Sequence, residues 1–344
     1  MSSNTAEEKY KLISRGLQEV LGEEEAKKIL QERDLKIHWG TAPTGKPHVA
    51  YFLPMLKLAD FLKAGCEVTV LLADIHAALD NLKTPLDLLN LRADYCKKVF
   101  QIMLRRIGAP LEKVRFVQGT EFQLEKDYTM DVHRFSTLVT VHDAQRAGAE
   151  VVKQTNNPLL GSLVYPGMQA LDEEYLGVDA QFGGIDQRKI FIYAEKYLPL
   201  LGYRKRIHLM NPIIQGLGEG KMSSSDEYSK IGLEDSDDII KKKVSKAYCE
   251  EGNISCNGLL SIAKGLILPV LLDRNEKLKI EIYKTKETRE YATGEELERD
   301  FAEKVIHPGD MKSSITRYLC DLVAPVREEL AQYRELESKA YPKK

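Results

Sequence analysis

Short apolar runs alternate with longer stretches of helical pattern between positions 35 and 194 of this chain. The apolar runs, which we predict to be strands, lie at 35–39, 67–74, 114–118 and 178–182. Apolar strands that alternate with helices are typical of a parallel sheet buried on both faces. We therefore predict an α/β fold with a Rossmann-like, doubly wound parallel sheet, in which ligands bind at the carboxyl ends of the strands.

The rest of the chain departs from this alternation. Residues 6–32 carry apolar side chains at helical spacing and predict a helix that stops at Gly22. Residues 120–176 predict a helical insertion between the two halves of the sheet. Helical patterns also dominate the end of the chain. We accordingly predict two domains, an α/β domain over 1–228 and a mainly helical C-terminal domain over 229–344.

Composition excludes several classes of protein. The net charge is only −2, so a nucleic acid would have to bind at local basic patches. The five cysteines are scattered without metal-binding spacing, which is typical of reduced thiols in the cytosol. No apolar stretch approaches the length of a membrane span. These features predict a cytoplasmic protein that does not enter a membrane.

Two short signatures point to a nucleotide. Residues 47–51 read Pro-His-Val-Ala-Tyr after a glycine turn, and we predict that Pro47 lies in the first turn of a helix with His48 near its positive end. Residues 221–225 read Lys-Met-Ser-Ser-Ser in a loop rich in glycine and serine. A histidine at a helix start and a lysine followed by hydroxyls suit the stabilisation of phosphates.

A P-loop is the competing interpretation of the first signature. Residues 40–46, Gly-Thr-Ala-Pro-Thr-Gly-Lys, nearly complete the pattern GxxxxGK[ST]. The failing position is Pro47, which has no hydroxyl for magnesium and no backbone N–H for a phosphate. A P-loop enzyme would hydrolyse nucleotide without any amino acid.

Longer segments around the signatures carry a resemblance to a known family. They are WGTAPTGKPH at 39–48, LADIHA at 72–77, YPGMQALD at 165–172 and FGGIDQRK at 182–189. With them the chain resembles the tyrosyl-tRNA synthetases of eukaryotes and archaea, which are class I aminoacyl-tRNA synthetases. The resemblance implies an ATP-dependent ligase that converts L-tyrosine to tyrosyl-adenylate and transfers the tyrosyl group to tRNA(Tyr). It makes 1–228 the catalytic domain and 229–344 the anticodon-binding domain.

The same resemblance assigns roles to individual residues. It implies that the catalytic residues are His48, Lys221, Ser223 and Ser224. It implies that tyrosine is bound by His38, Ala73, Tyr165, Gln169, Asp172 and Gln187. It implies that ATP is bound by Gly40, Thr41, His48, Tyr51, Gly183, Asp186, Lys221 and Met222. Magnesium is expected to arrive with ATP, and no metal held by the protein itself is implied.

Partners follow from the resemblance as well. It implies a homodimer formed through 120–176, although the apolar side chains there could equally be internal core. His307 and Asp310 match the segment that reads the anticodon. Relatives carry an aromatic residue before a Gly-Gly pair in this domain, and the charged, β-leaning stretch at 275–289 has neither. Base stacking could then come from Tyr283 or Tyr291.

One position of the tyrosine pocket departs from the family. His38 stands where relatives usually have a tyrosine that reaches the substrate hydroxyl, and we expect the charge of its imidazole to depend on pH. The chain could be a divergent tyrosine enzyme or an enzyme with altered aromatic specificity. It could also be a non-catalytic tRNA-binding homologue, although intact His48, Lys221 and Asp172 count against that alternative.

Overall fold

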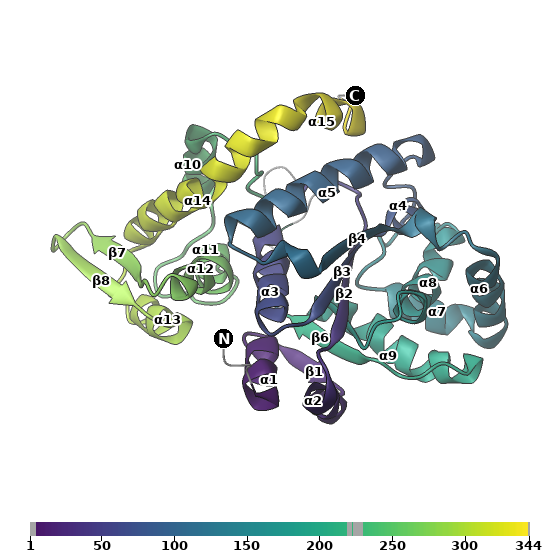
Figure 1. Cartoon of the computed structure of the whole chain (residues 1–344). Helices are drawn as coiled ribbons and strands as arrows, with labels where there is room; N and C mark the ends of the chain where they lie inside the picture. Colours follow the sequence, from purple (N-terminus) through teal and green to yellow (C-terminus); the bar gives the residue numbers. More distant parts are fainter. Residues whose placement is uncertain (1–4, 219–221, 223–229, 343–344) are drawn as a thin grey trace.

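The computed structural model describes residues 5–218, 222 and 230–342, and a six-stranded sheet lies at its centre (Figure 1). The strand order is β1-β6-β5-β2-β3-β4, and every neighbouring pair is parallel except β1 with β6. The strands are β1 Glu19–Leu21, β2 Lys36–Thr41, β3 Glu67–Leu72, β4 Val114–Gln118, β5 Ala180–Gly184 and β6 Ile207–Asn211. The predicted α/β fold is confirmed, and β6 is a central strand that the sequence prediction missed.

The prediction of one helix that runs from the start of 6–32 to a stop at Gly22 is wrong. Helix α1 (Ala6–Ser14) ends before β1, and α2 (Glu23–Glu32) starts after Gly22. Gly22 has a φ of 86° and begins the second helix rather than ending the first. Val20 and Leu21 lie in the antiparallel edge strand, because their backbones pair with Leu209 and His208 of β6.

Helices cover both faces of the sheet (Figure 1). The helices α3 (Phe52–Lys63) and α5 (Leu89–Arg106) pack on β3 from one face. The predicted helical insertion is confirmed as α6 (Lys126–Leu138), α7 (Val141–Gly148) and α8 (Gly161–Tyr175). Helix α8 packs on α6 and α7, and α7 and α8 pack on α9 (Arg188–Tyr197). The short helix α4 (Asp74–Leu79) contacts both α5 and α8. This packing places the insertion beside the carboxyl ends of the strands.

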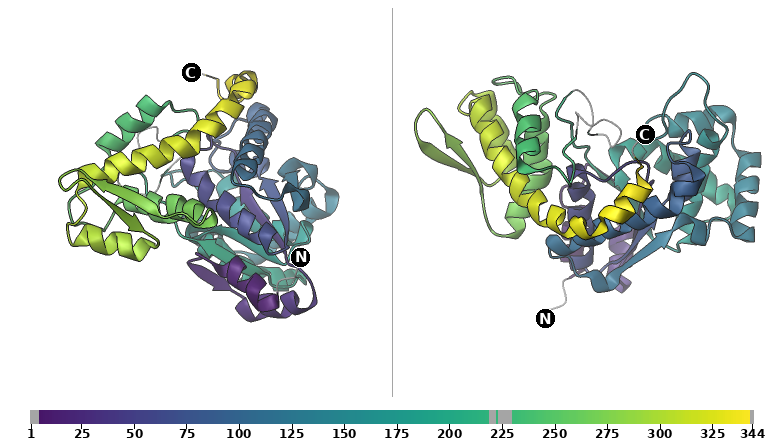
Figure 2. Two further views of the ribbon diagram at one scale, coloured as in Figure 1. Left: turned by 60° about the vertical axis from the view of Figure 1, so that its left-hand side comes forward. Right: turned by 90° about the horizontal axis from the view of Figure 1, so that it is seen from above.

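The last part of the chain is mainly helical, as predicted. Its helices are α10 Asp237–Lys246, α11 Gly258–Ile262, α12 Leu268–Asp273, α13 Gly294–Ala302, α14 Pro308–Leu330 and α15 Arg334–Ala340. A π-helical segment, η7 (Ala263–Ile267), joins α11 to α12, and the hairpin of β7 (Leu278–Ile282) and β8 (Glu287–Tyr291) accounts for the β-leaning stretch. Helices α14 and α15 return over the α/β part and lie along α5 (Figure 2).

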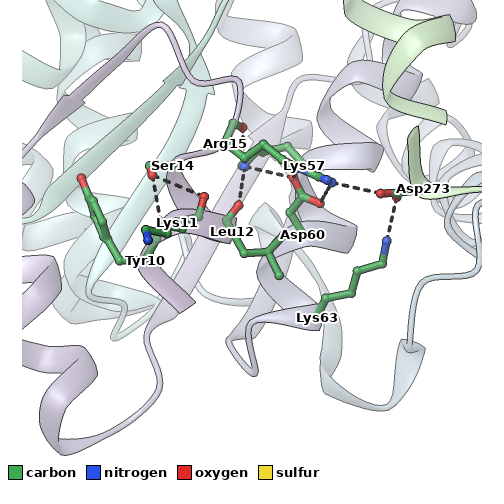
Figure 3. A network of polar contacts seen from close by, with 9 residues as sticks. All are labelled: Tyr10, Lys11, Leu12, Ser14, Arg15, Lys57, Asp60, Lys63 and Asp273. Atoms are coloured by element: carbon green, nitrogen blue, oxygen red, sulfur yellow. Dashed lines mark hydrogen bonds and ion pairs between the residues drawn. The ribbon is translucent and has the colours of Figure 1, made fainter. Parts of the chain in front are cut away.

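A network of charges joins the two parts of the chain (Figure 3). Arg15 at the end of α1 pairs with Asp60 of α3 and, at 3.2 Å, with Asp273 of α12. Lys63 also pairs with Asp273, at 2.7 Å. Beneath them, Lys57 is buried and donates to Asp60 at 3.1 Å, and burial lowers its pKa to about 8. Three helices distant in sequence are thereby fixed at one point.

Among the residues that the structure describes, no helix is both long and apolar enough to cross a lipid bilayer.

Candidate active site

The six residues predicted to bind tyrosine line one small cavity. Its volume is about 130 Å³, and it opens between β2, the end of β3, α4 and α8. The six are His38, Ala73, Tyr165, Gln169, Asp172 and Gln187. Gly40 and Thr41, which we predicted for ATP, line this same cavity. The structure therefore brings together segments that lie more than a hundred positions apart in the sequence.

Asp172 is the buried carboxylate of this cavity. Gln123 Nε2 and Tyr128 Oη donate to its Oδ1 atom at 2.7 and 2.8 Å. Burial raises the pKa of Asp172 to about 8, against the effect of these two hydrogen bonds. His76 Nε2 lies 3.9 Å from the other carboxylate oxygen. Sequence reasoning missed Gln123 and Tyr128, which no local pattern distinguishes from other polar residues of the insertion.

His38 is completely buried at the centre of the sheet. Neither ring nitrogen has a hydrogen-bond partner among the described residues. Burial, reinforced by the positive charges of His208 and Arg206, lowers the pKa of His38 to about 3. The expectation of a pH-dependent charge is therefore wrong, and the imidazole is neutral at physiological pH. A neutral ring offers one donor and one acceptor to whatever fills the cavity.

A polar row across the sheet explains this environment. His38 of β2 is in register with Gln181 of β5, and Gln181 with His208 of β6, so the three side chains share one face. Although burial opposes its charge, ion pairs with Glu173 and Glu195 raise the pKa of His208 to about 9. This cation, two strands away, adds to burial, which is the larger cause of the low pKa of His38.

A second and larger cavity, of about 750 Å³, is lined by four of the residues predicted for ATP. His48, Tyr51, Asp186 and Met222 line it. Met222 is the only residue of the second signature that the structure describes; Lys221, Ser223 and Ser224 lie outside the described residues. The side chain of His48 is buried, and its ring meets that of Tyr51 edge to face at 5.1 Å.

The helix start predicted at Pro47 is wrong. His48 has an extended backbone, with a φ of −137°, and a single 3-10 turn (η1, Val49–Tyr51) separates it from α3. The cause is tertiary: His48 forms an isolated antiparallel bridge with Gly232, and Val49 N donates to Ile231 O at 2.9 Å. The position of His48 is thus set by the chain that follows the second signature.

Gly183, the remaining residue predicted for ATP, lines neither of these two cavities. A Cβ atom there would lie 2.9 Å from Gln187 Cγ and 3.0 Å from the ring of Phe191. Because Gly183 has no side chain, β5 can lie close to the turn that carries Gln187.

The two residues predicted for the anticodon lie at the start of α14. His307 caps the helix, with Nδ1 accepting from Gly309 N at 3.0 Å, and Asp310 Oδ1 accepts from Tyr283 N at 3.2 Å. Tyr283 is 78% exposed, and Lys286 Nζ lies over its ring, 4.0 Å from the ring centre. Tyr291 is buried and donates to Asp300 at 3.0 Å, so the alternative that its ring stacks on a base is wrong.

Sequence comparison identifies the family of this site. Residues 30–323 match the family described as tRNA synthetases class I (W and Y). The chain belongs to this family. Among its class I synthetase relatives, the cytoplasmic tyrosine–tRNA ligase of Xenopus laevis is 58% identical over 342 residues, which cover 99% of this chain. This chain spans 64% of the length of that relative.

Other synthetases are matched over their whole length. The probable cytoplasmic tyrosine–tRNA ligase of Encephalitozoon cuniculi is 50% identical, with 98% of this chain and 99% of that protein covered. The tyrosyl-tRNA synthetase of Archaeoglobus fulgidus, solved with L-tyrosine, superposes with a TM-score of 0.85 at 38% identity and covers 94% of this chain and 99% of its own. That of Pyrococcus horikoshii, also solved with L-tyrosine, gives 0.89 at 27% identity, covering 97% and 99%.

Proposed function

We propose that this chain is a cytoplasmic tyrosine–tRNA ligase. The carboxylate of tyrosine attacks the α-phosphorus of ATP, and pyrophosphate leaves with formation of tyrosyl-adenylate. A terminal ribose hydroxyl of tRNA(Tyr) then attacks the acyl carbon, and AMP leaves. The observation that carries this proposal is the buried carboxylate of Asp172, which faces a cavity of amino-acid size.

The smaller cavity binds tyrosine, and the larger cavity binds the phosphates of ATP. Asp172 accepts a hydrogen bond from the phenolic hydroxyl of tyrosine. Phenylalanine has no hydroxyl and would leave this buried acceptor without a partner, which penalises its binding. Gln169 and Gln187, which hydrogen-bond each other at 2.9 Å, meet the ammonium end of the substrate together with Tyr165. His48 and, from the sequence, Lys221 stabilise the charge that develops on the phosphates.

Magnesium enters this proposal as part of the ATP substrate. The carboxylates that line the larger cavity are Asp186 and Glu150. Mg²⁺ typically keeps several waters and binds through phosphates and one or two carboxylates, which fits this sparse set. The metal would neutralise charge on the phosphates, while the protein residues bind and orient the nucleotide.

The P-loop alternative conflicts with the structure. Lys46, which would have to reach the phosphates, instead pairs with Glu234 at 3.0 Å and with Glu337. The complete tyrosine cavity likewise disfavours a homologue that only binds tRNA.

Amino-acid-dependent exchange of pyrophosphate into ATP tests the proposal. We expect exchange with L-tyrosine and none with the Lys221→Ala variant, since the lysine supplies charge to the pyrophosphate. Exchange that is absent from the unaltered chain with every amino acid would refute the proposed activity. Charging of a tRNA(Tyr) transcript then tests the second step.

His38 determines how the pocket treats substituted rings. We expect His38→Tyr to lower exchange with ring-substituted tyrosines, measured against exchange with tyrosine, by about tenfold, because the larger side chain takes up space in the cavity that His38 and Asp172 both line. His133→Tyr, at an exposed position of α6, is the matched control. If phenylalanine or an analogue is activated better than tyrosine by the unaltered chain, the substrate assignment is wrong.

Two partners complete the proposal. A homodimer is supported by the insertion, where Val141 is 61% exposed and Val139 and Val132 line an adjacent apolar groove. Phe135, by contrast, is internal core. Recognition of the tRNA(Tyr) anticodon is assigned to His307 and Asp310, with stacking by the exposed ring of Tyr283.

A further inference from the structure

The turn at 43–46, which precedes His48, is held by partners from outside it. Thr44 and Gly45 of this turn line the larger cavity. The carbonyl of Thr44 accepts from Arg92 Nη1 of α5 at 2.6 Å. The carbonyl of Gly45 accepts from Tyr341 Oη, directly after α15, at 3.1 Å. A wall of the ATP cavity therefore depends on two side chains that do not belong to that cavity.

The side chain of Lys46 makes the third link. Its ammonium pairs with Glu337 of α15 and, at 3.0 Å, with Glu234. Glu234 in turn accepts from Tyr95 Oη of α5 at 2.9 Å. The side chain of Glu337 is only 19% exposed, so its pair with Lys46 is screened less by water than a surface pair.

The guanidinium of Arg92 binds both the 43–46 turn and the end of α15. Its Nε atom donates to Ala340 O at 3.0 Å, while Nη1 donates to Thr44 O. The guanidinium also lies over the ring of Tyr341, 4.8 Å from the ring centre. Because the fork of an arginine is planar, these contacts fix the turn and the helix end in one relative position.

We propose that residues 337–341 are a positioning element for ATP: through Lys46 and Arg92 they fix the 43–46 turn and so the phosphate side of the cavity. The proposal rests on the proposed function. The turn has no regular secondary structure, so the repeating backbone hydrogen bonds of a helix or strand do not fix its shape. External contacts order it before ATP arrives, and ordering in advance improves binding and rate.

The test compares two glutamates of α15. Glu337→Gln removes the charge that faces Lys46 while keeping the size of the side chain. Glu335→Gln is the matched control, because Glu335 is exposed and its partner within the described part of the chain is Lys339, on the surface. In tyrosine-dependent exchange at varied ATP, we expect Glu337→Gln to raise the KM for ATP about five- to tenfold. Tyrosine affinity, measured by equilibrium dialysis, should stay within about twofold.

A double-mutant cycle separates positioning from general stabilisation. Lys46→Met should raise the KM for ATP as Glu337→Gln does, and the double variant should be no worse than either single variant. Arg92→Lys keeps the charge but loses the fork, and it too should affect ATP and spare tyrosine.

The inference is overturned if Glu337→Gln behaves like Glu335→Gln, or if affinity for tyrosine weakens in parallel with that for ATP. Either result, with exchange intact in the unaltered chain, leaves the proposed function standing. Absence of exchange in the unaltered chain would instead overturn the proposed function itself.

Discussion

The His48→Ala substitution is expected to lower the rate of tyrosine-dependent pyrophosphate exchange by about 100- to 1,000-fold and to leave the affinity for tyrosine unchanged. His48 lines the larger cavity and not the smaller one, so its imidazole can act only on the phosphate side. The bridge to Gly232 fixes its backbone, which means that the donor is in place before charge develops. Groups held in this way contribute more to the transition state than to ground-state binding.

Steady-state exchange and equilibrium dialysis of tyrosine measure the two quantities separately. His133→Ala provides the control, because His133 is exposed on α6 and away from both cavities. A loss of less than about fivefold in the His48 variant would contradict a role in stabilising the transition state, since one preorganised donor contributes far more. Equal losses of rate and of tyrosine affinity would mean that the substitution disturbs the fold.

The Asp172→Asn variant is expected to lose discrimination between tyrosine and phenylalanine. Hydrogen bonds to a charged group contribute about 1.5–3 kcal/mol, so kcat/KM for tyrosine should fall about 10- to 100-fold while that for phenylalanine changes little. An amide is a poorer replacement for the carboxylate. Gln123 and Tyr128 donate to Oδ1 and so hold the amide oxygen there, which leaves an NH2 group that can donate to the phenolic oxygen but cannot accept the phenolic proton.

Competition between the two amino acids in the exchange reaction measures this change. Asp127→Asn is the matched control, because that carboxylate is exposed on α6. Parallel losses for tyrosine and phenylalanine would show that Asp172 only supports the cavity and does not read the hydroxyl.

The raised pKa of Asp172 adds a pH dependence with a definite sign. In the empty cavity this pKa is about 8, so the carboxyl is protonated at lower pH and must lose a proton before it accepts the phenol. Tyrosine affinity should therefore rise about tenfold per pH unit below 8 and level off above it. The Asp172→Asn variant should show no such dependence, and a flat profile in the unaltered chain would contradict the assignment.

The sequence predicted the parts of this molecule that depend on local pattern. The apolar runs of β2 to β5 identified four strands. The six residues predicted for tyrosine line one cavity; five of them lie in the family segments, and the sixth, His38, is the position that departs from the family. What failed depends on tertiary partners. Val20 and Leu21 have helical spacing, and they form a strand only because β6 lies beside them. His48 is extended because Gly232 pairs with it.

The environment of the buried groups was equally out of reach of the sequence. The charge state of His38 follows from the register of β2, β5 and β6, which sets it on one face with His208. The hydrogen bonds of Asp172 come from a turn and a helix of the insertion, whose packing no local pattern encodes.

The path of α14 and α15 has a consequence for how such a chain can change. Helix α14 carries Asp310 in its first turn and runs for 23 residues, about 35 Å, before η8 (Ala331–Tyr333) and α15 lead to the 43–46 turn. One residue added to α14 would rotate everything beyond it by about 100° and carry Glu337 away from Lys46. The number of residues in α14 is therefore constrained: an insertion or deletion keeps Glu337 facing Lys46 only when it adds or removes nearly whole helical turns.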